Sequence, residues 1–244
     1  MKTKRDRYQK RQERVRPRPS RRRRLFGWLG GALAVVLAVA VILSARSGPV
    51  ALQYRRLRVD QDLYHYLLSY YKYQILIGIK GEGVSDTPAF WAAPYEGNPS
   101  LTNEQYYRAM AELLIKQTIV AAYHYDAQGY RLSVDERAAV NGAVADVLTY
   151  GAGGDKRTFN EKAARYGFDY DAFRRAALYL YKAHALRARL YADTSMTEEE
   201  ADTAFAAFLG QHVGEVVLRE QVTGAVDFAA LPYNSELVIR SFTQ

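Results

Sequence analysis

Four histidines are the first side chains to test for chemistry, because the chain contains no cysteine. They are His65, His124, His184 and His212. A helical zinc site needs two histidines four residues apart, as in H-x-x-x-H or H-E-x-x-H, and no pair among them has that spacing. The missing cysteines exclude disulfides, cysteine-ligated zinc, iron–sulfur clusters and a thiol nucleophile. We therefore predict no metal and no cofactor.

Acid–base and nucleophilic chemistry have no better candidates. No serine lies in a G-x-S-x-G turn, and no pair of carboxylates stands out by its spacing. Glu198, Glu199 and Glu200 look like a metal cluster, but they fill the first turn of an expected helix, where negative charge is favourable. The glycines around Gly151 lack the lysine and the serine or threonine of a phosphate loop. The sequence therefore predicts a protein that is not an enzyme.

Tyrosine is the most unusual component, with 20 in a chain of 244 residues. A dense group comprises Tyr64, Tyr66, Tyr70, Tyr71 and Tyr73. Five aromatic side chains on about three helical turns exceed what one core-facing stripe of about 100° can cover. We expect some of them to line a groove that grips extended apolar polypeptide, roofed by the loop that carries Phe90 and Trp91. The alternative is that tyrosine fills a core that is lean in Phe and Leu.

The helices that would position these residues are predicted from their start signals. Capping boxes, in which Ser or Thr is followed three residues later by Glu or Gln, begin at Thr102, Ser133, Thr158 and Thr197. Asp60 or Asp62 can cap an earlier helix that runs through Leu76, and Asp169 can cap a long one through Leu190. Four boxes in about 100 residues are typical of a mainly α domain.

The remaining segments differ in period and composition. Val213–Val222 and Glu236–Phe242 are rich in Val, Ile and Leu and predict two strands, paired as a C-terminal β-hairpin on the helices. Residues 84–101 contain three prolines and are expected to form a long ordered loop. The predicted organisation is a basic tail (1–24), a transmembrane helix (25–45), a linker (46–59), a helical domain (60–210) and C-terminal strands (211–244).

The N-terminal region predicts a membrane anchor. Residues 1–24 carry 13 Lys and Arg against Asp6 and Glu13, so this arm has a net charge of +11 and the rest of the chain −3. Residues 25–45 contain no charged side chain. At about 1.5 Å per residue, a helix of that length spans about 30 Å, the thickness of the hydrocarbon core. The positive-inside rule keeps the arm in the cytoplasm and predicts an exported, extracytoplasmic C-terminal domain.

Other interpretations of this region remain open. A cleaved signal peptide has an apolar region of about 7–15 residues and small residues at its cleavage site, whereas Leu43-Ser44-Ala45 places a bulky side chain there. A twin-arginine signal is a second alternative. Membrane-surface contacts with anionic lipid headgroups are expected from Arg21, Arg22, Arg23 and Arg24. Binding of the arm to RNA or DNA is the less favoured possibility, and we expect no nucleic-acid partner.

The order of the pieces between residues 102 and 208 resembles the N-terminal chaperone domain of the SurA/PrsA family. The matching pieces stand here as Ala127-Gln128-Gly129-Tyr130, Leu132-Ser133-Val134-Asp135-Glu136, Thr158-Phe159-Asn160-Glu161 with Tyr166-Gly167, Phe168-Asp169-Tyr170-Asp171-Ala172-Phe173-Arg174 and Met196-Thr197-Glu198-Glu199-Glu200. The last of these is similar to the acidic start of the helix that leads into the parvulin module. The resemblance covers about half of the chain.

This resemblance implies a membrane-anchored chaperone-like protein that binds unfolded or secreted polypeptides without ATP. In these foldases a parvulin prolyl-isomerase module follows, but here only residues 211–244 remain, with His212 as their single histidine. We therefore expect no isomerase activity. The alternative is an envelope scaffold with one fixed partner. A chaperone should expose a broad apolar groove, whereas a scaffold should expose one compact patch.

Overall fold

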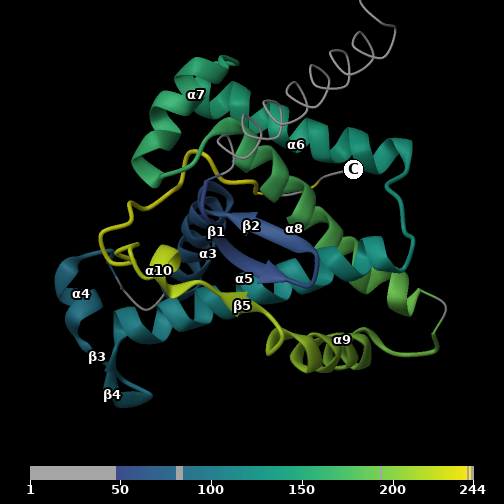
Figure 1. The fold of residues 1–244 in the computed structure, drawn as a ribbon, viewed down its shortest axis with the longest axis horizontal. Helices are drawn as coiled ribbons and strands as arrows, with labels where there is room; N and C mark the ends of the chain where they lie inside the picture. The colour runs from purple at the N-terminus through teal and green to yellow at the C-terminus, as the bar shows by residue number, and fades with distance from the viewer. Residues whose placement is uncertain (1–47, 81–84, 193, 241, 243–244) are drawn as a thin grey trace, which may run out of the picture. The chain divides into compact units, whose positions relative to one another are not determined.

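The computed structural model describes residues 48–80, 85–192, 194–240 and 242, which form a mainly helical domain with small sheets (Figure 1). The predicted mainly α class is thus confirmed. The three longest described helices are α3 (Gln61–Lys80), α5 (Asn103–Ala127) and α8 (Tyr170–Tyr191), and α5 packs against both of the others. The helix expected after Asp60 is α3, and the Asp60 side chain accepts a hydrogen bond from the Leu63 amide at 3.0 Å.

Three of the four predicted capping boxes are confirmed. Thr102 caps α5, Ser133 caps α6 (Val134–Ala152) and Thr197 caps α9 (Glu198–Val213), each with the reciprocal bond from the third helical residue. Asp169 caps α8 as expected. These starts are fixed by contacts within four residues, so the local sequence is sufficient to place them.

The fourth box, at Thr158, is wrong. Helix α7 (Lys156–Ala163) begins earlier, because the Asp155 carboxylate accepts a hydrogen bond from the Thr158 amide at 2.7 Å. Gly153 and Gly154 both have positive φ, which lets the chain turn sharply after α6 and leaves Asp155 at the capping position. A 3₁₀ turn, η1 (Ala164–Tyr166), then leads to Gly167.

The linker expected at 46–59 is wrong from residue 50 onward, since those residues belong to the domain. Strands β1 (Val50–Tyr54) and β2 (Leu57–Asp60) form an antiparallel hairpin, and β5 (Val217–Leu218) pairs with β1 on its other side, giving the order β2-β1-β5. Ala51, Leu52 and Val59 are fully buried in this sheet. The compact unit accordingly starts at Gly48, upstream of the predicted boundary.

The predicted C-terminal hairpin is also wrong. Of Val213–Val222, only Val217–Leu218 is a strand, and it is followed by the short helix α10 (Glu220–Thr223). Residues 225–240, here named the C-terminal segment, contain neither helix nor strand and run from α10 across the helices (Figure 1). Their apolar side chains are buried nonetheless, with Phe228 and Leu237 at 0 % exposure. The Val, Ile and Leu pattern therefore reflects burial against helices rather than pairing in a sheet.

The expected loop at 84–101 has structure of its own where it is described. It contains α4 (Pro88–Ala92) and a small hairpin, β3 (Pro94–Tyr95) with β4 (Asn98–Thr102). The Tyr95 ring stacks on Tyr106 of α5 with ring centroids 3.6 Å apart. This contact fixes the hairpin to the helix that follows it.

The predicted membrane anchor at 25–45 and the basic arm at 1–24, including Arg21, Arg22, Arg23 and Arg24, lie outside the described residues. Among the helices that are described, none is long and apolar enough to cross a bilayer.

Candidate functional site

Tyr64 and Tyr66 lie in the core. Both are fully buried, and the Tyr66 ring meets Phe168 and Phe173 edge-on at 5.0 and 5.4 Å. These two fit the alternative in which tyrosine fills the core, because α3 contacts α5, α8, the β1–β2 hairpin, η1 and α10. A helix that is covered on several sides needs no polar face.

The other three tyrosines of the group are half-buried. Tyr71 hydrogen-bonds to Thr118 of α5 through its hydroxyl, and the Tyr70 ring packs on Tyr71 at 5.1 Å. Tyr73 lies at the end of the group, with its ring 5.2 Å from that of Tyr233 in the C-terminal segment. Tyr73 therefore stands at the border between the core and the surface.

Trp91 packs on the C-terminal segment, and Phe90 packs on Trp91 and on α5. Trp91 is 2 % exposed, its indole nitrogen donates to Asp86 Oδ1 at 2.6 Å, and its ring lies 5.4 Å from that of Phe228. Phe90 packs between Trp91 and Tyr107. Trp91, supported by Phe90, therefore forms a wall beneath Phe228 of the C-terminal segment.

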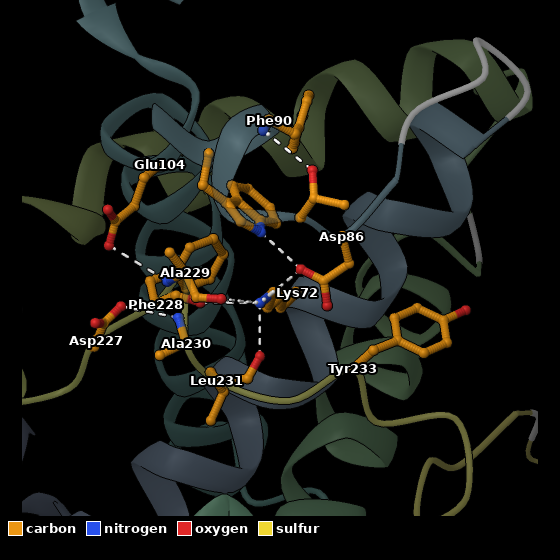
Figure 2. A network of polar contacts seen from close by, with 12 residues as sticks. Lys72, Asp86, Phe90, Glu104, Asp227, Phe228, Ala229, Ala230, Leu231 and Tyr233 are labelled. Atoms are coloured by element: carbon orange, nitrogen blue, oxygen red, sulfur yellow. Dashed lines mark hydrogen bonds and ion pairs between the residues drawn. The ribbon is translucent and has the colours of Figure 1, made fainter. Parts of the chain in front are cut away.

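The residue at the centre of this arrangement is Lys72, which the sequence did not single out (Figure 2). Its side chain is 1 % exposed, and its ammonium group donates to the main-chain oxygens of Phe228, Ala229 and Leu231 at 3.0, 3.1 and 2.6 Å. A fourth partner is Asp86 Oδ1 at 3.1 Å. Three ammonium protons are thus shared among four oxygens, which satisfies a buried charge.

Burial and a neighbouring carboxylate have opposite effects on the pKa of Lys72. Burial lowers the pKa of Lys72, while Asp86 acts in the other direction by favouring the charged form. The Trp91 ring adds a cation–π contact, with Nζ 4.8 Å from its centroid. One sequence signal could have revealed this residue, since Lys72 is the sole lysine, arginine, aspartate or glutamate between Asp62 and Lys80.

Arg108 of α5, like Lys72, binds main-chain carbonyl oxygens. Its guanidinium donates to the carbonyl oxygens of Val226 at 2.9 Å and Thr223 at 2.8 Å, and to the Glu112 carboxylate at 3.1 Å. Together, Lys72 and Arg108 bind five main-chain carbonyls of residues 223–231. Such contacts recognise the polypeptide backbone and are independent of the side chains that the bound residues carry.

The second half of the C-terminal segment is fixed by Asn234 and by apolar side chains. Asn234 is fully buried, donates to Ser69 Oγ of α3 at 3.3 Å and accepts from the Leu237 amide at 3.0 Å. The main chain at Glu236 passes so close to Gly151 of α6 that a Cβ atom there would lie 2.9 Å from the Glu236 carbonyl oxygen. Only glycine therefore fits at position 151 without a shift of the segment.

Three of the four histidines have structural partners. His65 Nδ1 lies 3.0 Å from the Gly167 oxygen, His124 Nε2 lies 3.0 Å from the Tyr54 hydroxyl, and His212 Nδ1 lies 3.0 Å from a Glu215 oxygen. His124 is 9 % exposed. Within the part of the chain that the structure describes, no three His, Cys, Asp or Glu residues are grouped to hold a metal ion.

No protein-family model, no curated protein and no solved structure matches this chain. The resemblance to the SurA/PrsA-type domain therefore stays a prediction that rests on the residues quoted above.

Proposed function

We propose that this chain is a membrane-anchored, extracytoplasmic, chaperone-like protein that binds unfolded or secreted polypeptides without ATP and without isomerase activity. The observation that supports it most is the way Lys72 and Arg108 bind carbonyl oxygens at the end of α10 and in the irregular stretch that follows it. Every residue offers a carbonyl, so a site of this kind accepts many sequences. Aromatic walls such as Trp91 add apolar contact area at a low cost in side-chain entropy.

Binding of extended peptides tests this proposal. The full chain in lipid nanodiscs would be titrated into several unrelated fluorescent peptides, with fluorescence anisotropy as the readout. We expect saturable binding of most apolar peptides, with dissociation constants between about 1 μM and about 1 mM, weak enough for release. A peptide of the same length built from Gly, Ser and Glu serves as the control. If the apolar peptides bind no better than that control, the proposed function is wrong.

The topology is a separate prediction. Because 13 basic residues precede the apolar span, a periplasmic-type reporter enzyme fused after Gln244 should be active, whereas the same enzyme fused ahead of Met1 should not. The protein should also keep its N-terminus. Activity of only the N-terminal fusion, or mature protein that starts at Arg46, would contradict the anchor.

A scaffold with one fixed partner is the second candidate, and the surface of α6 favours it. A hollow of about 780 Å³ is lined there in part by small residues such as Ala139 and Gly142, and an adjoining hollow of about 430 Å³ lies beside the exposed Tyr150. Both are lined by Ala143 and Asp146. Tight binding of one native envelope protein, lost on an Ala143→Arg change and with no binding of unrelated peptides, would favour this function over the first.

A further inference from the structure

We propose that the surface of α3, α4 and α5 beneath the C-terminal segment is the polypeptide-binding site, and that residues 225–240 fill it as an internal ligand that an extended polypeptide displaces. This inference rests on the proposed function, and it names the location of the site and the class of ligand. The starting observation is that Lys72, Trp91 and Arg108 contact this part of the chain in the manner expected for a bound peptide.

The C-terminal segment depends little on its own main-chain hydrogen bonds. Val226 and Leu231 donate within turns, to Thr223 at 3.2 Å and to Asp227 at 3.1 Å. Within the described residues 232–240, no main-chain hydrogen bond joins the segment to another main-chain group. Opening of the segment therefore breaks side-chain contacts and hydrogen bonds to side chains, and few main-chain hydrogen bonds of its own.

Packing beside the second half of the segment is incomplete. The hollow of about 430 Å³ is lined by Val147 and Tyr150 of α6 and by Glu236, Val238 and Arg240 of the segment. Tyr150 is 88 % exposed beside this hollow, so an apolar ring is already available to an incoming chain. The segment can therefore be lifted from the α6 side while the contacts of Lys72 remain in place.

The residues of the C-terminal segment that fill the proposed site indicate which class of ligand it binds. The apolar contacts come from Phe228 and Leu231, three residues apart, and from Leu237 and Ile239, two residues apart, and all four are buried. An extended chain with aromatic or branched apolar residues at these spacings reproduces them. Its carbonyl oxygens replace those that Lys72 now binds, so the positive charge keeps its hydrogen bonds when the ligands exchange.

A reversible covalent lock tests the displacement. The Asn234 amide meets Ser69 Oγ across 3.3 Å, and the chain contains no cysteine, so Ser69→Cys with Asn234→Cys offers a single possible disulfide. The full chain in nanodiscs would be titrated with the fluorescent apolar peptides in the oxidised and in the reduced form. The single variants, treated with the same oxidant and reductant, are the matched controls.

We expect the oxidised double variant to bind the peptides at least about tenfold more weakly than its own reduced form, because the lock removes the open state that binds. Equal binding in both forms would overturn the inference and leave the proposed function standing. Absence of binding in every form, including the unmodified protein, would remove the proposed function itself.

Hydrogen exchange on the unmodified chain gives an answer even where the double variant does not fold or oxidise. Addition of a saturating apolar peptide should speed amide exchange in residues 225–240 while helix α8, used as an internal control, keeps its rate. A segment that stays equally protected, or becomes more protected, while the peptide is bound would show that the peptide binds elsewhere and would overturn the inference.

Discussion

Raising the pH above about 10 is expected to unfold the domain, because two of its buried tyrosines resist ionisation. Burial raises the pKa of Tyr64 and of Tyr66 well above the ordinary value near 10. In the unfolded chain these hydroxyls lose their protons near pH 10, so the folded state binds more protons above that pH, and stability falls as the pH rises. Two such groups lower the free energy of unfolding by about 3 kcal/mol per pH unit.

Lys72 has the opposite effect on the free energy of unfolding, over a lower range of pH. Since burial lowers its pKa, the unfolded chain binds more protons between the folded pKa of Lys72 and about 10.5, and stability rises with pH in that window. Above about 10.5 this contribution is complete, and the tyrosines determine the slope.

Tyrosinate absorbance and far-ultraviolet circular dichroism, recorded together against pH, check the alkaline transition. Part of the tyrosine absorbance should appear only with the loss of helix. Tyr66→Phe should reduce the slope of the free energy of unfolding by about 1.4 kcal/mol per pH unit, whereas Tyr150→Phe, at a site that is 88 % exposed, should leave it unchanged. If all twenty tyrosines titrate near pH 10 while the helix signal persists, the burial described for α3 is wrong.

Lys72→Met is expected to lower the free energy of unfolding by about 3 to 5 kcal/mol, although methionine has a similar length and is apolar. The loss comes from the partners, because three main-chain oxygens and Asp86 would lose a charged donor in a site with little access to water. Urea denaturation followed by circular dichroism measures the effect.

Lys156→Met provides the matched control for that change. Lys156 is exposed and contacts only the face of Tyr170, with Nζ 4.8 Å from the ring centroid, so its replacement should cost less than about 1 kcal/mol. Equal effects of the two substitutions would mean that Lys72 is not the buried centre of the network.

The helix starts could be predicted from the sequence because their determinants are local. Thr102, Ser133 and Thr197 each exchange reciprocal hydrogen bonds with the residue three positions later, and such pairs are visible in the sequence. The β1–β2 hairpin was missed for a local reason as well. Its turn places Arg55 at a φ of 51°, where glycine or asparagine is the usual signal, so nothing in the sequence marked it.

The candidate site could not be predicted, because its contacts join residues far apart in the chain. Lys72 binds oxygens 156 to 159 positions away, and Asn234 reaches Ser69 across 165 positions. The C-terminal segment has the apolar composition of strands, but its partners are side chains of helices that only the tertiary fold brings beneath it. Which tyrosines of α3 are buried could not be predicted for the same reason, since the sequence does not show that α3 is covered on several sides.

Site-specific photocrosslinking in cells tests the central claim most directly. A photoreactive phenylalanine derivative would replace Tyr73, which borders the C-terminal segment beside Tyr233, and in a second strain Met196, which is 47 % exposed ahead of α9. If the chain binds unfolded polypeptides at this site, position 73 should capture many unrelated exported proteins and position 196 few. Capture of one and the same partner in every sample, or no excess over position 196, would contradict the chaperone-like function.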